Sequence, residues 1–278
     1  MYGVKEMCRV FGVSRSRYYA QLNSDGSKRW REDQRLLVSI KASFDGSDRT
    51  YGADRICRDL RDQGICVGKN RVWRLMKQQG LRVKTMRRFK VTTNSDHKRP
   101  VAPNLVRRNF TAPTPDRLWT GDITYIWTAE GWLYLAVILD VFSRRIVGWS
   151  MKRRMTDDLV ITAFNNAVVR RSPSRGVIFH SDRGSQYCSK RFQSLVQGIG
   201  GIQSMSGTGS CYDNAITESF FGTMKRELVH HCSFESRSEA QSLIFRYIEC
   251  FYNRRRRHSS IGYQAPEEYE RLFSKIAV

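Results

Sequence analysis

Three acidic side chains stand out because of the residues around them. Asp122 lies within a run of apolar and β-forming residues that begins at Leu118, where a charge is costly unless it is paired or bound to a metal ion. Asp182 follows the predicted strand 176–180, and ligands bind at the carboxyl ends of strands in open α/β sheets. Glu218 lies in a stretch with helical spacing. If the three carboxylates face one crevice, they could hold two Mg²⁺ ions about 3.5–4 Å apart and support an in-line phosphoryl transfer.

The elements that would position these acids can be predicted from hydrophobic periodicity. β-Forming runs predict an antiparallel meander of three strands, then two strands joined through helices, which make an α/β sheet covered on both faces. The strands are expected at 118–127, 133–139, 145–149, 176–180 and 202–205, and the helices at 156–168, 190–197, 210–221 and 239–253. Asp140, which ends the second strand, is expected to bond backbone amides in a turn. His180 is expected to pack or hydrogen-bond near the site without acting as a base.

The composition indicates a polyanionic partner. The 278-residue chain has 48 Lys and Arg against 26 Asp and Glu, a formal net charge of +22. Basic side chains that neutralise phosphates release bound counterions, so nucleic acid is favoured over a small neutral substrate. With 40% apolar residues the chain is expected to fold. We expect no membrane span and no secretion signal, and scattered cysteines without a CxxC pair indicate a reducing cytoplasm.

The positive charge is concentrated in the first part of the chain. Residues 1–115 hold 26 basic and 10 acidic residues, whereas residues 116–278 hold 22 and 16. Four of the six prolines lie between Pro100 and Pro115, which is typical of an extended linker. Five parts are therefore predicted: a short helix-turn-helix-like segment at 1–30, a helical helix-turn-helix-like DNA-binding domain at 31–95, a Pro-rich basic linker at 96–115, an α/β core at 116–235 and a C-terminal helical extension at 236–278.

Several basic residues are predicted to contact DNA. A helix, a turn at Gly12 and a second helix that Ser14 could cap place Arg15 and Arg17 where a helix-turn-helix contacts bases. The alternative for this segment is a helical hairpin that mediates oligomerisation. The stretch 71–90 has no acidic residue and eight basic ones that are expected to contact phosphates: Arg71, Arg74, Lys77, Arg82, Lys84, Arg87, Arg88 and Lys90. The same role is predicted for a run after the helix 239–253: Arg254, Arg255, Arg256 and Arg257.

Local sequence strings around the acids identify a family. Asp182 and Glu218 have 35 residues between them, and each lies in a distinctive motif. The motifs are Trp119 with Asp122–Ile126, then Leu139–Trp149, His180–Tyr187, Tyr212–Ala215 with Glu218–Phe220, and Tyr252, Asn253, Arg257, His258, Gly262, Tyr263 and Pro266. Across residues 35–270 the chain resembles bacterial insertion-sequence transposases of the OrfB type, whose core belongs to the DDE, retroviral-integrase-like superfamily.

The resemblance implies a fold and a set of site residues. The expected fold is α/β, an RNase H-like five-stranded mixed sheet flanked by helices and preceded by the helical DNA-binding units. Asp122, Asp182 and Glu218 correspond to the catalytic triad that holds two Mg²⁺ ions, which Mn²⁺ can replace. Lys225 follows Glu218 by about two helical turns and is expected to hold a DNA phosphate beside it.

The resemblance also implies an activity and partners. The expected activity is nicking of transposon ends and 3′-hydroxyl strand transfer, by a copy-out route through a circular intermediate. The expected partners are double-stranded DNA at terminal inverted repeats and at the target, further copies of the chain, and an upstream-frame OrfA protein or a frameshift fusion with it. The expected location is the bacterial cytoplasm, at the nucleoid. Two alternatives are a catalytically silent DNA-binding regulator and an RNase H-type nuclease that acts on RNA–DNA hybrids.

Overall fold

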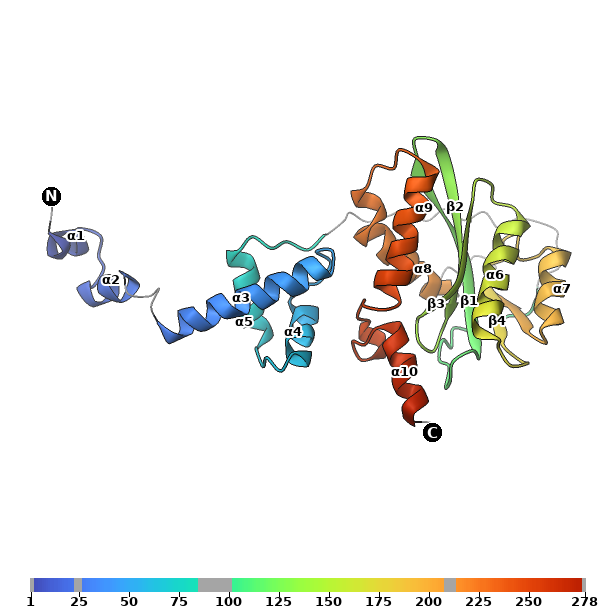
Figure 1. Ribbon diagram of the computed structural model, residues 1–278, viewed down its shortest axis with the longest axis horizontal. Helices are drawn as coiled ribbons and strands as arrows, with labels where there is room; N and C mark the ends of the chain where they lie inside the picture. The colour runs from blue at the N-terminus through green and yellow to red at the C-terminus, as the bar shows by residue number, and fades with distance from the viewer. Residues whose placement is uncertain (1–2, 23–26, 85–101, 208–213, 277–278) are drawn as a thin grey trace. The chain divides into compact units, whose positions relative to one another are not determined.

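The computed structural model describes residues 3–22, 27–84, 102–207 and 214–276 (Figure 1). The chain forms two compact units, of which the first ends at Val83 and the second begins at Lys84. No helix in the described ranges is long and apolar enough to cross a membrane. The five-part division of the chain stays a prediction.

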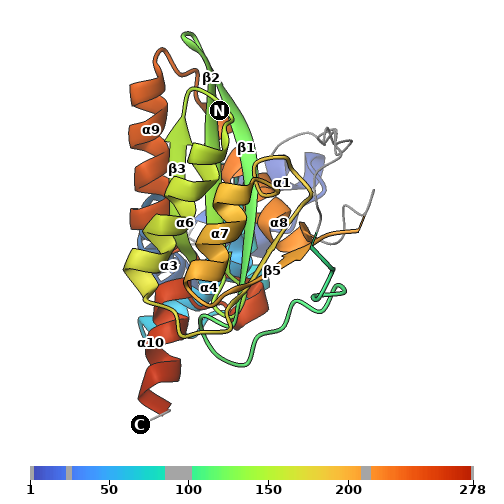
Figure 2. The same cartoon turned by 90° about the vertical axis from the view of Figure 1, so that its right-hand side faces the viewer.

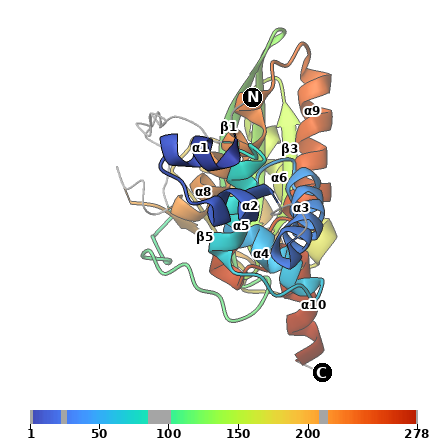
Figure 3. The same cartoon turned by 90° about the vertical axis from the view of Figure 1, so that its left-hand side faces the viewer.

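The first unit is helical, as predicted (Figure 3). Its helices are α1 (Val4–Val10), α2 (Arg15–Leu22), α3 (Lys28–Gly46), α4 (Ala53–Asp62) and α5 (Lys69–Gln78). The chain turns between α1 and α2 at Gly12, whose φ of 62° suits glycine. The Ser14 hydroxyl accepts a hydrogen bond from the Arg17 amide at 3.2 Å, which confirms the predicted cap. Helices α3 to α5 share a core whose fully buried members include Ile40, Ile56 and Val72.

The second unit is built on the five-stranded mixed sheet that was predicted. Its strands are β1 (Leu118–Thr128), β2 (Gly131–Asp140), β3 (Ile146–Lys152), β4 (Ile178–Ser181) and β5 (Ile202–Met205). They lie in the order β3-β2-β1-β4-β5. Strands β1, β2 and β3 pair antiparallel, whereas β1, β4 and β5 pair parallel. This arrangement confirms the meander followed by two crossover strands.

Helices cover both faces of this sheet (Figures 1 and 2). The helical segments are α6 (Asp157–Arg171), α7 (Lys190–Gly198), α8 (Ala215–Glu227), η3 (Val229–His231), α9 (Arg237–Phe245), η4 (Arg246–Tyr252), η5 (Ser259–Ile261) and α10 (Pro266–Ile276). Helices α6 and α7 lie on one face, and α8 and α9 lie on the other. The helix expected at 239–253 begins as the α-helix α9 and continues as the π-helical segment η4.

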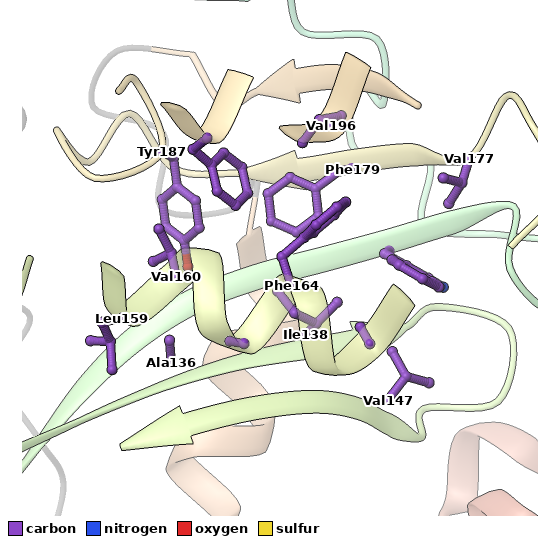
Figure 4. Close-up of a cluster of buried hydrophobic side chains, with 14 of the residues drawn as sticks. Ala136, Ile138, Val147, Leu159, Val160, Phe164, Val177, Phe179, Tyr187 and Val196 are labelled. Atoms are coloured by element: carbon purple, nitrogen blue, oxygen red, sulfur yellow. The ribbon is translucent and has the colours of Figure 1, made fainter. Parts of the chain in front are cut away.

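The larger core lies between the sheet and helices α6 and α7 (Figure 4). Its centre is aromatic: Phe164 of α6 packs against Phe179 of β4 with ring centres 5.3 Å apart, and against Phe192 of α7 at 5.4 Å. Gly148 of β3 lets α6 approach closely, because a Cβ there would lie 2.3 Å from the carbonyl oxygen of Ala163. This close packing fixes the position of α6 on the sheet.

Part of the Pro-rich stretch packs against this core. Residues 85–101 lie outside the described ranges, but the stretch 102–116 makes contacts with the sheet. The amide of Leu105 donates to the Ser204 hydroxyl of β5 at 2.9 Å, and Val106 is buried against Leu118 and Val141. This segment leads directly into β1.

A buried network of charges fixes the end of the sheet where β1 begins. Asp140, fully buried at the end of β2, accepts hydrogen bonds from the amides of Asp116 at 2.7 Å and Phe142 at 2.8 Å. Arg171, at the end of α6, donates to Asp116 at 2.9 Å and to Glu270 of α10 at 2.8 Å. The network therefore joins β1, β2, α6 and α10, and it confirms the structural role expected for Asp140.

The buried position of Asp140 predicts a pH-dependent stability. Burial, with the nearby carboxylates of Asp116 and Glu270, raises the pKa of Asp140 to about 7. The stabilisation from protonated Asp140 is fully present below the unfolded-state pKa, about 3.9, and is lost as the pH rises through about 7. Between pH 5 and pH 8 the wild type should therefore lose about 3 kcal/mol that Asp140→Asn does not lose. Denaturant unfolding at a series of pH values measures this difference, with the exposed Asp158→Asn as control. Parallel stability curves for wild type and Asp140→Asn would contradict it.

Candidate active site

The sheet register places Asp122 and Asp182 side by side. Gly121 of β1 pairs with Ser181 of β4 in parallel, so Asp122 and Asp182 occupy the next positions along the two neighbouring strands. Neighbouring strands lie about 4.8 Å apart. The carboxylate of Asp182 accepts a hydrogen bond from the amide of Gly184 at 2.9 Å, which holds it in the turn after β4.

Helix α8 brings Glu218 to the same place. Thr120 and Asp122 share a face of β1, since alternate residues of a strand point the same way. On that face the Thr217 hydroxyl donates to the Thr120 hydroxyl at 2.7 Å, and both side chains are fully buried. Asn214, which precedes α8, donates from its side chain to the Gly121 carbonyl at 3.3 Å. These two contacts fix the first turn of α8, where Glu218 lies, beside Asp122.

The charges of Asp182 and Glu218 act on Asp122. Burial raises the pKa of Asp122 well above its usual range, and the negative charges of Asp182 and Glu218 raise it further. Burial also raises the pKa of Glu218, with a further contribution from Asp182. Like charges perturb each other in this way only over short distances in a partly buried site. Such a group of perturbed carboxylates at the end of a strand is typical of an active site.

Lys225 lies beside these carboxylates. Its ammonium group lies 5.3 Å from the centre of the Tyr125 ring, as in a cation–π contact, and its positive charge lowers the pKa of Asp122. Burial lowers the pKa of Lys225 itself, and Asp122 partly offsets this effect. The lysine therefore lies within electrostatic reach of Asp122, two turns of α8 beyond Glu218.

The donor set suits a hard divalent cation, although the side chains do not form a ready metal cage. Carboxylate oxygens are the ligands that Mg²⁺ prefers, and a divalent cation would relieve the repulsion among Asp122, Asp182 and Glu218. In the ranges that the structure describes, no three acidic, histidine or cysteine side chains are placed closely enough to hold an ion. Residues 208–213, just before α8, lie outside those ranges. The three acids therefore fit the ion by the chemistry of their oxygen ligands, and not by an arrangement of side chains already closed around it.

His180 is occupied in the core. It is fully buried in β4, and its Nδ1 lies 2.9 Å from the Ser204 hydroxyl. Its ring also packs edge-on against Phe110, with centres 6.1 Å apart. This confirms the expectation that His180 packs and hydrogen-bonds near the site.

Two arginines of the predicted phosphate-binding stretch form ion pairs within the first unit. Arg71 contacts Asp33 at 2.8 Å and Glu32 at 3.3 Å, and Arg74 contacts Asp33 at 2.7 Å. Burial opposes ionisation of Asp33, but the hydrogen bonds from Arg74 and Arg71 prevail and lower its pKa. Arg71 and Arg74 therefore attach α5 to α3, a role that the local sequence did not predict.

The other residues of that stretch divide by exposure. Lys77 and Arg82 are exposed, as are Arg15 and Arg17 of α2, and Lys84 is half-buried. Arg87, Arg88 and Lys90 lie outside the described residues. The exposed side chains remain predicted DNA contacts.

The prediction that Arg256 contacts DNA is corrected by the structure. Its side chain is only 6% exposed and pairs with Glu227, at the end of α8, at 2.7 Å. The Tyr247 hydroxyl donates to the same carboxylate at 2.7 Å, so one buried cluster joins α8 to the C-terminal segment. Four consecutive arginines gave no sign that one of them turns inward. Arg254 and Arg255 are exposed, and Arg257 is half-buried and donates to the Tyr263 carbonyl at 3.0 Å.

Sequence reasoning missed the residues that orient the acids. Thr120 and Thr217 lie next to the acidic motifs, and Asn214 belongs to one of them, but their contacts join positions about a hundred residues apart. The signal was the presence of small polar residues beside each acid. Such residues also occur in ordinary strands and helix caps, so the signal alone could not identify them.

Known protein domains match both units of the chain. An integrase core domain matches residues 112–211, a second integrase core domain matches residues 201–266, and an HTH-like domain matches residues 31–89. The insertion element IS600 31 kDa protein of Shigella sonnei is 45% identical over 271 residues, which cover 98% of this chain and 100% of the relative. Transposase InsF for insertion sequence IS3A of Escherichia coli (strain K12) is 43% identical over 271 residues, covering 97% and 94%.

Two solved structures also resemble the chain. The HTLV-2 integrase catalytic core domain in complex with magnesium (trimeric form) is 16% identical, with a TM-score of 0.45, and the match covers 58% of this chain and 99% of that one. A simian T-cell lymphotropic virus intasome in complex with the PP2A regulatory subunit B56 gamma gives 15% identity and a TM-score of 0.48, covering 79% and 70%.

The sheet order, the matched integrase core domains and the transposase relatives define a DDE polynucleotidyl transferase with an RNase H-like core and an HTH-like domain. This is an enzyme class of DNA transposition and integration. Within that class the chain belongs to the family of insertion-sequence transposases that includes the InsF proteins of IS3.

The burial of Arg256 predicts opposite results for two adjacent arginines. Arg256→Ala would leave Glu227 buried without its cation and should lower the free energy of unfolding by about 3 kcal/mol. Arg255→Ala, at an exposed position, should change it by less than about 0.5 kcal/mol. Denaturant unfolding of both variants measures the difference, and equal effects would contradict the structural role of Arg256.

Proposed function

We propose that this transposase nicks transposon ends and joins the freed 3′-hydroxyl to a second phosphodiester, with Asp122, Asp182 and Glu218 as its metal-binding catalytic residues. The observation that carries the proposal is that parallel pairing of β1 and β4 and the attachment of α8 to β1 bring three acids to the end of β4, where burial and the neighbouring carboxylates raise the pKa of Asp122 and of Glu218. Without a counter-charge this arrangement destabilises the fold, so a role for it in binding cations is favoured.

The cofactor that suits this site is Mg²⁺, as two ions that Mn²⁺ can replace. When bound, the ions would stabilise the charge on the attacking and leaving oxygens of the phosphoryl transfer. Asp122 would hold them from β1 and Asp182 from the turn after β4, and Glu218 would complete the site from α8. A related fold, the HTLV-2 integrase core, was solved in complex with magnesium.

The other residues of the site would bind and orient DNA. Lys225, half-buried beside Asp122, would hold a phosphate of the strand next to the reacting one. Thr217 and Asn214 would keep Glu218 aligned with β1. His180 already contacts Ser204 in the core, so no step is assigned to it. Catalysis by such a site consists mainly of positioning and charge stabilisation.

Partners follow from the two units. The first unit would bind the terminal inverted repeats, with Lys77 and Arg82 of the HTH-like domain and Arg15 and Arg17 of α2 exposed for contact. The second unit would act on the repeat ends and on target DNA, with Arg254 and Arg255 at its surface. We further propose that the chain works as an oligomer that pairs two ends, with an OrfA partner or as a fusion with it, at the nucleoid.

Neutral substitutions in the triad should separate catalysis from DNA binding. Asp122→Asn and Glu218→Gln should lower cleavage and strand transfer about a thousandfold or more, because each removes an oxygen charge that holds the cation. Binding to end DNA should stay within about twofold of the wild type, since that contact is assigned to the HTH-like domain. Cleavage of a labelled inverted-repeat duplex and a mobility-shift assay measure the two effects.

The thermal unfolding temperature tests the same residues without a measurement of activity. In buffer free of divalent ions both variants should unfold at a higher temperature than the wild type, because they remove carboxylate repulsion. Added Mg²⁺ should raise the unfolding temperature of the wild type only.

Full strand transfer by either variant would overturn the triad. Cleavage of an RNA–DNA hybrid in preference to the inverted-repeat duplex would indicate the nuclease, and end binding without any cleavage by the wild type would indicate the regulator.

Salt dependence should distinguish phosphate contacts from ion pairs in the first unit. Affinity for end DNA should fall steeply with salt, and Lys77→Ala or Arg82→Ala should each reduce the logarithmic slope by about one. Arg74→Ala should instead lower thermal stability, because Asp33 loses a partner in α5. Fluorescence anisotropy across a salt series measures the slope. A flat salt dependence of the wild type would contradict a DNA-binding role for this unit.

A further inference from the structure

Three aromatic side chains form an exposed cluster on the hairpin that joins β1 and β2. Tyr125, Trp127 and Trp132, the hairpin aromatic cluster, are 36%, 59% and 42% exposed. The ring of Trp132 packs edge-on against Tyr125, with centres 5.0 Å apart, and against Trp127 at 4.9 Å. Figures 1 and 2 show that this hairpin extends past the other strands of the sheet.

The backbone holds the cluster in a defined shape. Trp127 and Trp132 are directly paired across the two antiparallel strands. The Thr128 hydroxyl donates to the Gly131 carbonyl at 2.7 Å and closes the turn, and Arg237 of α9 donates to the Trp132 carbonyl at 3.1 Å. Large rings that are preorganised yet exposed are characteristic of binding surfaces.

Two rings of the cluster lie on the same strand as Asp122, around its open edge. Tyr125 follows Asp122 by three residues, about 10 Å, and Trp127 lies about 17 Å from it; strand alternation directs both rings to the other face of β1, so a DNA strand would reach them by passing around that edge. Strand β4 pairs with β1 only from Leu118 to Gly121, so along the described chain no strand covers this edge beyond Asp122. Lys225 connects the two places, since its ammonium lies over Tyr125 and its charge acts on Asp122.

We propose that the hairpin aromatic cluster stacks against unpaired bases of the DNA strand held at the carboxylates. A paired duplex presents phosphates and base edges to a protein, whereas an unpaired nucleotide exposes the face of its base, which any aromatic ring can stack on. The distance from Asp122 to Trp127 matches a few nucleotides of extended strand. Lys225 flanks the rings with a positive charge that suits a phosphate backbone, whereas the charge of Arg237 is paired with Glu130 at 3.7 Å.

Unpaired DNA bases suit the hairpin aromatic cluster better than a protein partner does. Three rings in a row beside cations and acids are typical of a single-strand platform, which combines stacking with electrostatic attraction. A stable protein interface needs about 800 Å² from each partner, and its core is depleted of charge. The proposal rests on the proposed function for the identity of the bound strand, but stacking requires neither metal nor cleavage and is measured separately.

The test uses the full chain and two probes in buffer without divalent ions. One probe is a duplex with a short unpaired 3′ tail that carries the fluorescent base 2-aminopurine, and the other is the blunt duplex of the same sequence. The wild type should bind the tailed probe about tenfold more tightly than the blunt one and quench its fluorescence by stacking. Trp127→Ala and Trp132→Ala should lose the preference and the quenching while keeping their affinity for the blunt duplex.

Matched controls keep the result interpretable. Trp127→Phe retains a ring and should retain most of the preference, which distinguishes stacking from a folding defect. Phe245→Ala removes an aromatic ring of α9 that is 47% exposed and lies outside the cluster, and it should behave as the wild type. Asp122→Asn should still quench the tail, so failure of the triad assignment and failure of this proposal are distinguishable.

Three results would overturn the proposal. The first is equal affinity of the wild type for tailed and blunt probes, with no quenching. The second is an equal loss of both affinities in Trp127→Ala, which would make the cluster a general surface for duplex DNA. The third is a change of oligomeric state in light scattering with the tail preference intact, which would make it a contact between proteins.

Discussion

The repulsion among three carboxylates is the constraint on which the second unit depends. Without the surrounding contacts, Asp122, Asp182 and Glu218 would move apart or become protonated. The raised pKa values of Asp122 and Glu218 reflect this tendency. The fold resists this separation with contacts that do not titrate. Parallel pairing of Gly121 with Ser181 fixes two of the acids, and the bond between Thr217 and Thr120 brings the third.

Helix α8 is attached at both of its ends. At its start, Asn214 and Thr217 bond β1; at its end, Glu227 lies in the buried cluster with Arg256 and Tyr247. The C-terminal segment therefore belongs physically to the catalytic core, because it supplies one of the two attachments. This explains how motifs near residue 253 accompany motifs near residue 122 in a chain of this family.

Periodicity predicted most of the architecture, whereas charge counting failed for particular arginines. The five strands and the helices on both faces could be predicted because their apolar spacing is local, whereas the triad stays a prediction from the distinctive string around each acid. Arg71, Arg74 and Arg256 could not be assigned, since their partners Asp33 and Glu227 lie far away along the chain. For the same reason, the contact of Asn214 with β1 and the π-helical form of η4 could not be predicted. A contact between residues far apart in the sequence is not reflected in the residues next to either of them along the chain.

The three acids are not held by equally rigid supports. Asp122 belongs to a strand and Asp182 directly follows one, and both strands are hydrogen-bonded into the sheet, while Glu218 depends on side-chain bonds between a helix and that sheet. A small displacement of α8 would therefore move Glu218 away from Asp122 and Asp182 while leaving the aromatic core between the sheet and α6 intact. Competence for chemistry and global foldedness are thus separate properties of this molecule, and a chain can keep the second after losing the first.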